Sequence, residues 1–231
     1  MNATDEKFLA GSQITISQSF GFSASHELWL LSTGHKCRRN HGHNYTVTAS
    51  ALVSDGVPGD LSPLGDYLAA TFDHRLLNEQ VGFHPTSELL AGHLAKWFRD
   101  NIESAMPVTL VAMVVSETSS TSARCDGLTG EVTISKTFKT RVGDTTLILG
   151  APDGLDEIGF ITDFGDLEPF SAYLHSRAAD DPQSRATCPA VVAHLATWFV
   201  DNIEPGIRGR LVSVQVDSEN TTGLWERGDA S

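Results

Sequence analysis

The chain has 231 residues, 40% of them hydrophobic, and a formal net charge of −13 at neutral pH. This content is sufficient for a buried core in one large domain or two small ones. The chain is acidic and has no stripe of basic residues, which argues against a nucleic-acid backbone as partner. Its three cysteines do not suggest a secreted disulfide scaffold. The first residues lack the apolar core of a signal peptide, and no apolar run is long enough to span a bilayer. We therefore expect a cytoplasmic protein that does not contact membranes.

Two segments near the N-terminus show the alternation of half-buried β-strands. From Ile14 to His26, the apolar residues and His26 share one parity, and most serine and threonine residues share the other. From His41 to Val53, the two histidines of His41-Gly42-His43 share a parity with Tyr45 and the apolar residues that follow. If the two strands pair in antiparallel fashion across the loop of residues 27–40, His26 lies opposite the histidine pair on one face of the sheet.

Three imidazoles on one face suggest a metal site. His26, His41 and His43 would provide three nitrogen ligands and leave a fourth position open, which is the pattern of a catalytic zinc site. If Cys37 also binds the metal, the site is closed and structural. In a third interpretation the histidines are ordinary core residues, although burying several unpaired imidazoles is costly. We favour metal binding over the core interpretation and an open site over a closed one, but the spacing alone does not separate the last two.

The remaining elements of the first half follow in chain order. Residues 1–12 are expected to form a disordered arm, and residues 54–58 a turn. Apolar residues at helical spacing predict one helix over residues 60–78 and a second over residues 87–101, after the start signal Pro85-Thr86. Residues 108–115 are a continuous apolar run, typical of a strand covered on both faces. The predicted order is strand, strand, helix, helix, strand, strand, which indicates an α+β fold.

The same order begins again after a seam near residues 127–130. Residues 15–20 are echoed by residues 133–138, residues 93–103 by residues 194–204, and the strand from Leu110 by the strand from Leu211. This self-similarity indicates an internal duplication. We predict a first domain over residues 12–128, which holds the metal, and a degenerate second domain over residues 129–231.

The second copy lacks most of the candidate site. Its first two strands are joined by the tight turn Val142-Gly143-Asp144, without the loop that carries the cysteine and the paired histidines. The first-copy residues Asp73-His74, Glu88 and Glu117 correspond to Ser176-Arg177, Pro189 and Glu219. We therefore expect the second copy to keep the fold without binding the metal, and we interpret Cys125 and Cys188 as small packing residues.

The segment Gly34–Tyr45 resembles the active-site segment of the 6-pyruvoyltetrahydropterin synthase / 6-carboxytetrahydropterin synthase family. The three-residue gap between Cys37 and His41 is similar to the 6-carboxy branch, which serves queuosine and other 7-deazapurine pathways. Further segments match in family order: Phe22–His26, Asp73–Asn78, Pro85–Glu88 and Val115–Thr118. The resemblance covers the first half of the chain, and several ordered motifs are far more specific than a lone pair of histidines.

The resemblance implies tandem tunnelling-fold (T-fold) units. Each would be an antiparallel four-stranded sheet with two helices on one face, in the order ββααββ, and such units assemble into homo-oligomers. It also implies three groups of site residues: His26, His41 and His43 as Zn2+ ligands, Cys37, Asp73 and His74 as proton-transfer residues, and Glu117, Thr86 and Glu88 as pterin-binding residues. The Asp-His pair can come from a neighbouring unit in this family.

The expected reaction is a lyase reaction that converts 7,8-dihydroneopterin triphosphate to 6-carboxy-5,6,7,8-tetrahydropterin. Lys36, Arg38 and Arg39 either contact the triphosphate or belong to an ordinary solvated loop. One alternative is a 6-pyruvoyltetrahydropterin synthase or a related pterin-tailoring enzyme. A second alternative, of a different class, is a non-catalytic pterin-binding or scaffold protein with structural zinc. The expected partners are a small pterin triphosphate and further copies of the chain.

Overall fold

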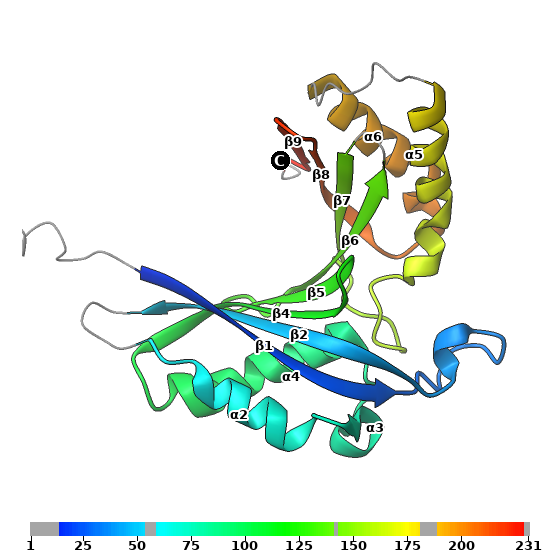
Figure 1. Ribbon diagram of the computed structural model, residues 1–231. Coiled ribbons are helices and arrows are strands. Elements are labelled where there is room, and N and C mark those ends of the chain that lie inside the picture. The colour runs from blue at the N-terminus through cyan, green and yellow to red at the C-terminus, as the bar shows by residue number, and fades with distance from the viewer. Residues whose placement is uncertain (1–13, 54–58, 141–142, 181–188, 229–231) are drawn as a thin grey trace, which may run out of the picture. The chain divides into compact units, whose positions relative to one another are not determined.

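The computed structural model describes residues 14–53, 59–140, 143–180 and 189–228. The expected arm of residues 1–12, the expected turn of residues 54–58 and Cys188 lie outside these described residues. The chain separates into two compact units, one made of residues 1–118 and 123–132 and the other of residues 119–122 and 133–231 (Figure 1). Each unit has an α+β fold.

The first unit is built on two long strands with the bounds expected from the alternation. β1 (Ile14–His26) pairs along its whole length with β2 (His41–Val53) in antiparallel fashion. The remaining strands of the unit are β3 (Arg75–Leu76), β4 (Val108–Thr118) and β5 (Thr121–Asp126), in the spatial order β3-β1-β2-β4-β5. A 3-10 turn, η1 (Lys36–Arg38), lies in the loop between β1 and β2.

Two helices cover one face of this sheet, α2 (Ser62–Thr71) and α4 (Ser87–Phe98), the latter continued by a π-helical turn, η2 (Arg99–Glu103) (Figure 1). The start signal at Thr86 is confirmed, because its hydroxyl accepts a hydrogen bond from the Leu89 N–H. The core between the layers consists of apolar side chains that are almost completely buried, including Leu64, Leu68, Leu90, Leu94, Phe98, Val47, Ala49 and Leu110.

The predicted helix over residues 60–78 is wrong in its C-terminal part. α2 ends at Thr71, the backbone takes a positive φ of 56° at His74, and the chain then forms β3, parallel to the end of β1, and α3 (Leu77–Gln80). The helix ends because residues 73 and 74 bond to β1 instead of continuing the helical hydrogen bonds. The Ser23 N–H donates to the Asp73 carboxylate, and the Ser23 carbonyl accepts the His74 N–H. The apolar spacing continued past this break because Leu77 is still buried in the core.

The expectation that residues 108–115 are covered on both faces is also not met in the described chain. In β4, buried residues alternate with residues that are exposed or partly exposed, such as Thr109, Val111 and Val114. Antiparallel sheets often have one covered face and one polar or partly open face. The opposite face of the first unit carries hydroxyl pairs such as Ser17–Ser50 and Ser19–Thr48.

The second unit repeats the order of elements. It contains β6 (Val132–Thr140), β7 (Gly143–Gly150), η3 (Phe164–Leu167), α5 (Glu168–Asp180), α6 (Pro189–Asn202), η4 (Glu204–Gly206), β8 (Arg210–Asp217) and β9 (Thr222–Glu226). Its strands lie in the order β6-β7-β8-β9. Thr140 pairs with Gly143, so the first two strands form a hairpin as expected, but Gly143 and Asp144 belong to β7 rather than to the predicted turn, and Val142 lies outside the described residues.

Some individual contacts within the first unit recur within the second. In the first unit, the Tyr67 ring stacks on Trp97 and its hydroxyl is hydrogen-bonded to His93 Nε2. In the second, Tyr173 stacks on Trp198 and is hydrogen-bonded to His194 Nε2. Both units also have a register shift at matching places, after Ser50 in β2 and after Ile148 in β7.

The expected match between Glu219 and Glu117 is wrong by one residue. Counting from the register shifts, Ser116 pairs with Thr46 in the first unit and Asp217 pairs with Asp144 in the second. Ser218 therefore occupies the position of Glu117, and Glu219 lies one residue further along, exposed beyond the end of β8. The second unit thus has no carboxylate at the matching position.

A carboxylate ties the helical layer to the sheet in each unit, which gives a first prediction. Glu204 is 4% exposed, accepts the Leu211 N–H and binds Arg210 and Arg227, whereas Glu103 accepts the Leu110 N–H and is only half-buried. We expect Glu204→Ala to lower the free energy of unfolding by about 2–3 kcal/mol, and Glu103→Ala by about 1 kcal/mol, because only Glu204 also makes charged hydrogen bonds to two arginines from a buried position. Urea unfolding measures both values, and equal losses would contradict this ranking.

Candidate active site

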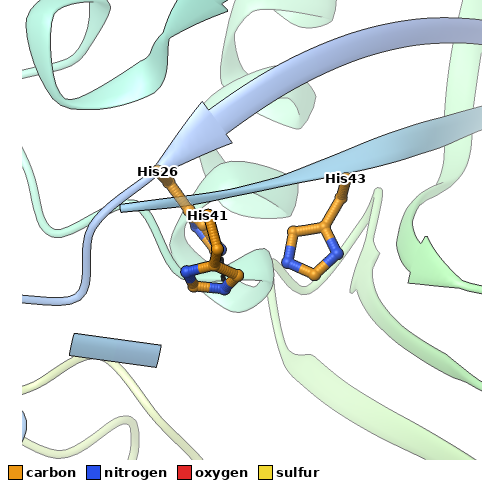
Figure 2. Close-up of side chains that lie close together, drawn as sticks. All are labelled: His26, His41 and His43. Carbon is orange, nitrogen blue, oxygen red and sulfur yellow. Dashed lines mark hydrogen bonds between the residues drawn. The ribbon is translucent and has the colours of Figure 1, made fainter. Parts of the chain in front are cut away.

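Three imidazoles meet where β1 ends and β2 begins (Figure 2). His26 is the last residue of β1 and pairs directly with His41, the first residue of β2, while His43 lies two residues further on the same face. The Nε2 atoms of His26 and His41 are 3.1 Å apart, and one ring nitrogen from each of the three residues lies within 4.8 Å of the others. The structure therefore brings together the three residues expected to hold zinc.

Backbone carbonyls fix the tautomers of two of these rings. His26 Nδ1 lies 2.8 Å from the Pro85 carbonyl oxygen, and His41 Nδ1 lies 2.7 Å from the Arg39 carbonyl oxygen. A carbonyl oxygen only accepts hydrogen bonds, so the Nδ1 of each ring must carry the hydrogen. The Nε2 of each neutral ring therefore has a free lone pair. Two lone pairs at 3.1 Å repel each other unless a cation or an additional proton lies between them.

The donor set fits a zinc ion. With Zn–N distances of about 2.0–2.1 Å, tetrahedral ligands are about 3.3–3.4 Å apart, close to the separation of the two Nε2 atoms. Ring N–H groups held by carbonyls are also the usual outer contacts of metal-binding histidines. The third ring gives independent support, because His43 Nε2 is buried without a hydrogen-bond partner among the described residues, and a metal would satisfy it.

Burial favours the neutral, metal-binding form of two of these rings. Desolvation lowers the pKa of His26 and of His43, and the negative charge of Glu117 opposes this shift to a smaller extent. His26 is 1% exposed, so a proton on its ring would place a charge inside the core. His26 and His43 are therefore prepared to bind a cation without first losing protons.

Glu117 lies on the same face, on the neighbouring strand. Because Thr46 pairs with Ser116, the register places Glu117 beside Tyr45, and its charge acts on His26, His43 and Tyr45. The pKa of Tyr45 is raised, first by burial of the phenol and then by the Glu117 carboxylate. A half-buried carboxylate beside the histidine cluster is suited to bind a cationic or amide-like group of a ligand.

Thr86 and Glu88 lie at the buried beginning of α4. Their exposures are 1% and 3%, and the Thr86 hydroxyl serves as the helix cap. The preceding residue, Pro85, supplies the carbonyl that holds His26, so this segment contacts the histidine cluster directly. Sequence reasoning placed Thr86 and Glu88 in the site but missed the Pro85 carbonyl, because a backbone group leaves no signal in residue types.

Cys37 lies in η1, four residues before His41, and its side chain is half-buried. Its backbone closes the loop, since its carbonyl accepts the Leu28 N–H at 3.1 Å and its N–H donates to His35 Nδ1 at 3.1 Å. The guanidinium of Arg38 is held by the Leu31 carbonyl, whereas Lys36 and Arg39 are exposed. Of the three basic residues in this loop, Lys36 and Arg39 therefore remain the more available for an anionic ligand.

Asp73 and His74 lie at the outer edge of β1. The Asp73 carboxylate accepts the Ser23 N–H at 2.9 Å and lies 2.9 Å from His74 Nδ1, and these two contacts, Ser23 first, lower its pKa. The His74 side chain is 81% exposed. It borders a cleft of about 470 Å³ that is also lined by Ser23, Ser25, Gly42, Asn44 and Arg75. The pair is therefore preassembled and accessible, but it is anchored to the strand edge rather than to the histidine cluster.

Within the described residues, no helix has the length and apolar character needed to cross a membrane.

Comparison with known proteins gives consistent matches for the first half of the chain. Residues 15–127 match the family model described as 6-pyruvoyl tetrahydropterin synthase, and all nine candidate site residues fall inside this segment. A protein of Archaeoglobus fulgidus, provisionally named 6-carboxy-5,6,7,8-tetrahydropterin synthase, is 38% identical over 85 residues, which are 33% of this chain and 68% of the relative.

Two solved structures are also similar. An uncharacterized protein from Wolinella succinogenes has 19% identity and a TM-score of 0.44, covering 50% of this chain and 99% of its own. The 6-pyruvoyl tetrahydropterin synthase of Caenorhabditis elegans has 25% identity and a TM-score of 0.39, covering 47% of this chain and 91% of its own.

The histidine cluster gives a second prediction. We expect the purified protein to contain about one zinc ion per chain, because among the described residues three imidazoles converge only in the first unit. His26→Ala and His43→Ala should each reduce the bound zinc by tenfold or more, as measured by elemental analysis after dialysis. The control is His194→Ala in the second unit, which should retain its metal, and loss of zinc from the control alone would contradict the assignment.

Proposed function

The chain belongs to the 6-pyruvoyl tetrahydropterin synthase family, and within that family we propose that it is a zinc-dependent 6-carboxy-5,6,7,8-tetrahydropterin synthase acting on 7,8-dihydroneopterin triphosphate. The observation that carries the proposal is the cluster of three histidines, in which one ring nitrogen of each lies within 4.8 Å of the others. The short gap between Cys37 and His41 and the name of the archaeal relative favour the 6-carboxy product over the 6-pyruvoyl product. A role in queuosine or another 7-deazapurine pathway is part of the same proposal.

The proposal assigns catalysis to residues 12–128 and leaves residues 129–231 as a degenerate, non-catalytic repeat. In support, the second unit joins its first two strands by a hairpin and has Ser218 where the first has Glu117. We also propose that the chain acts as a homo-oligomer. The exposed Asp73–His74 pair supports this, because it could serve a neighbouring copy.

When bound, zinc would act as a Lewis acid that makes the hydroxyls of the substrate side chain more acidic and stabilises developing negative charge. His26, His41 and His43 would hold it, with the first two rings oriented by the carbonyls of Pro85 and Arg39. Because the carbonyls fix these rings before any ligand arrives, the coordination geometry costs little reorganisation.

Cys37 is the proposed base that removes a proton from the substrate side chain. It lies in a loop with Lys36, Arg38 and Arg39, and positive surroundings of this kind are where reactive thiolates occur. The loop is closed by the Leu28–Cys37 hydrogen bond, which limits the positions that the sulfur can take. Positioning of this kind is required because proton transfer needs the base within hydrogen-bond reach of the reacting carbon or oxygen.

Asp73 and His74 are proposed to move a second proton. The carboxylate lies against Nδ1 of the imidazole, so it would fix the ring and stabilise its protonated form, leaving Nε2 to exchange a proton with the substrate. Glu117, aided by Thr86 and Glu88, would bind the amino-pyrimidine edge of the pterin, where two adjacent N–H groups match a carboxylate.

A third prediction tests the reaction. Zinc-loaded protein incubated with 7,8-dihydroneopterin triphosphate should form 6-carboxy-5,6,7,8-tetrahydropterin, identified by mass spectrometry after chromatography. Formation of the 6-pyruvoyl compound would move the assignment to the other branch of the family. If no pterin is consumed by fully metal-loaded protein, the enzymatic proposal fails.

A fourth prediction concerns the base. Cys37→Ala should reduce turnover by about 10²–10⁴-fold, the usual contribution of general base catalysis, while retaining zinc. The matched control is Cys125→Ala, a buried cysteine on β5 of the same unit, which should keep both zinc and turnover. Loss of zinc from the Cys37 variant would instead indicate a closed structural site in which the sulfur is a ligand.

A further inference from the structure

Two polar groups on adjacent strands of the first unit have complementary hydrogen-bonding capacities that are not used. The Tyr45 hydroxyl is buried and has no hydrogen-bond partner among the described residues. In the same part of the chain, no described donor contacts the carboxylate of Glu117, although its charge acts on Tyr45. In the described chain, the Tyr45 hydroxyl, a donor without an acceptor, thus lies beside the Glu117 carboxylate, an acceptor without a donor.

The strands hold these two residues next to each other. Thr46 pairs with Ser116, so one further step along the register brings Tyr45 opposite Glu117, and directly opposed residues have Cβ atoms about 4.5–5.5 Å apart. The phenol ring cannot turn away, because it stacks on Phe22 at a centroid distance of 4.9 Å and an interplanar angle of 8°. Edge-on contacts with His26 and His43 enclose it further.

The other two tyrosines show that this situation is exceptional in the protein. Tyr67 and Tyr173 are less buried, yet each hydroxyl is hydrogen-bonded to a histidine nitrogen, at 3.0 Å and 2.7 Å. Tyr45 is 2% exposed and would gain most from a partner. A phenylalanine would fill the same space without burying a hydroxyl. Packing alone therefore does not explain why this residue is a tyrosine.

We propose that Tyr45 is a positioning residue for Glu117, and that its hydroxyl donates a hydrogen bond to the Glu117 carboxylate when a pterin is bound. This inference rests on the proposed function, in which the carboxylate binds two N–H groups of the pterin. An ionised carboxylate has about four acceptor positions, so two remain after that contact. When a ligand displaces water from the half-buried Glu117 carboxylate, the Tyr45 hydroxyl becomes the neighbouring protein donor for the remaining acceptor positions.

The test compares binding of neopterin, a fluorescent pterin without phosphates, to the zinc-loaded wild type and to Tyr45→Phe. The variant should bind neopterin about tenfold more weakly, the usual effect of losing a hydrogen bond to a charged group. Its zinc content should be unchanged and its melting temperature equal or higher, because the substitution removes only an unpaired hydroxyl. A lower melting temperature with unchanged affinity would assign Tyr45 a purely structural role.

A double-mutant cycle tests whether Tyr45 acts through Glu117. In a Glu117→Ala background, adding Tyr45→Phe should change the neopterin affinity by less than twofold, because the acceptor is already gone. A further tenfold loss would show that the hydroxyl contacts the ligand directly and would overturn the positioning role. The matched control is Tyr67→Phe, which loses a satisfied hydrogen bond and should lower the melting temperature without changing affinity.

The wild type separates this inference from the proposed function. If the wild-type protein does not bind neopterin, both the pterin assignment and the Tyr45 inference fail. If the wild type binds and Tyr45→Phe binds equally well, only the Tyr45 inference is overturned.

Discussion

The antiparallel pairing of β1 with β2 is the constraint on which the candidate site depends. It runs from Ile14 opposite Val53 to His26 opposite His41 without interruption. A slip of one residue would send His26 and the His-Gly-His pair to opposite faces of the sheet, because strand side chains alternate. What prevents the slip is the core itself, since Phe22, Tyr45 and Val47 are buried on the same face as the histidines. The packing that stabilises the unit therefore also sets the distances between the imidazoles.

Strand pairing brings the rings together, and backbone carbonyls from two other segments orient them. The Arg39 carbonyl belongs to the loop that also carries Cys37, and the Pro85 carbonyl immediately precedes the cap of α4. The helical layer and the loop that carries Cys37 thus each hold one ring by a single hydrogen bond. A shift of either segment would change a ring's tautomer or direction, so the geometry of the histidine cluster depends on the packing of the whole unit.

Much of this arrangement could be predicted from the sequence, because it depends on short periods. Alternation in residues 14–26 and 41–53 gave the strands and the shared face of the histidines, and Thr86 gave the start of α4. The end of α2 could not be predicted, because the competing partner, Ser23, is fifty residues away in the sequence. The one-residue offset at Glu219 has a different cause: the Ser-Glu pair was matched by residue type, whereas the constant spacing from Leu110 to Leu211 already places Ser218 at the position of Glu117. The unpaired hydroxyl of Tyr45 was invisible as well, since a tyrosine on a core face looks like any other buried aromatic residue.

The two buried polar atoms without partners, on His43 and Tyr45, both lie in the first unit, and none is found in the described part of the second. Each such atom weakens the ligand-free fold by about 1–3 kcal/mol. Within its described residues the second unit bears no such cost, so substitutions that stabilise it need not preserve a polar atom that awaits a ligand.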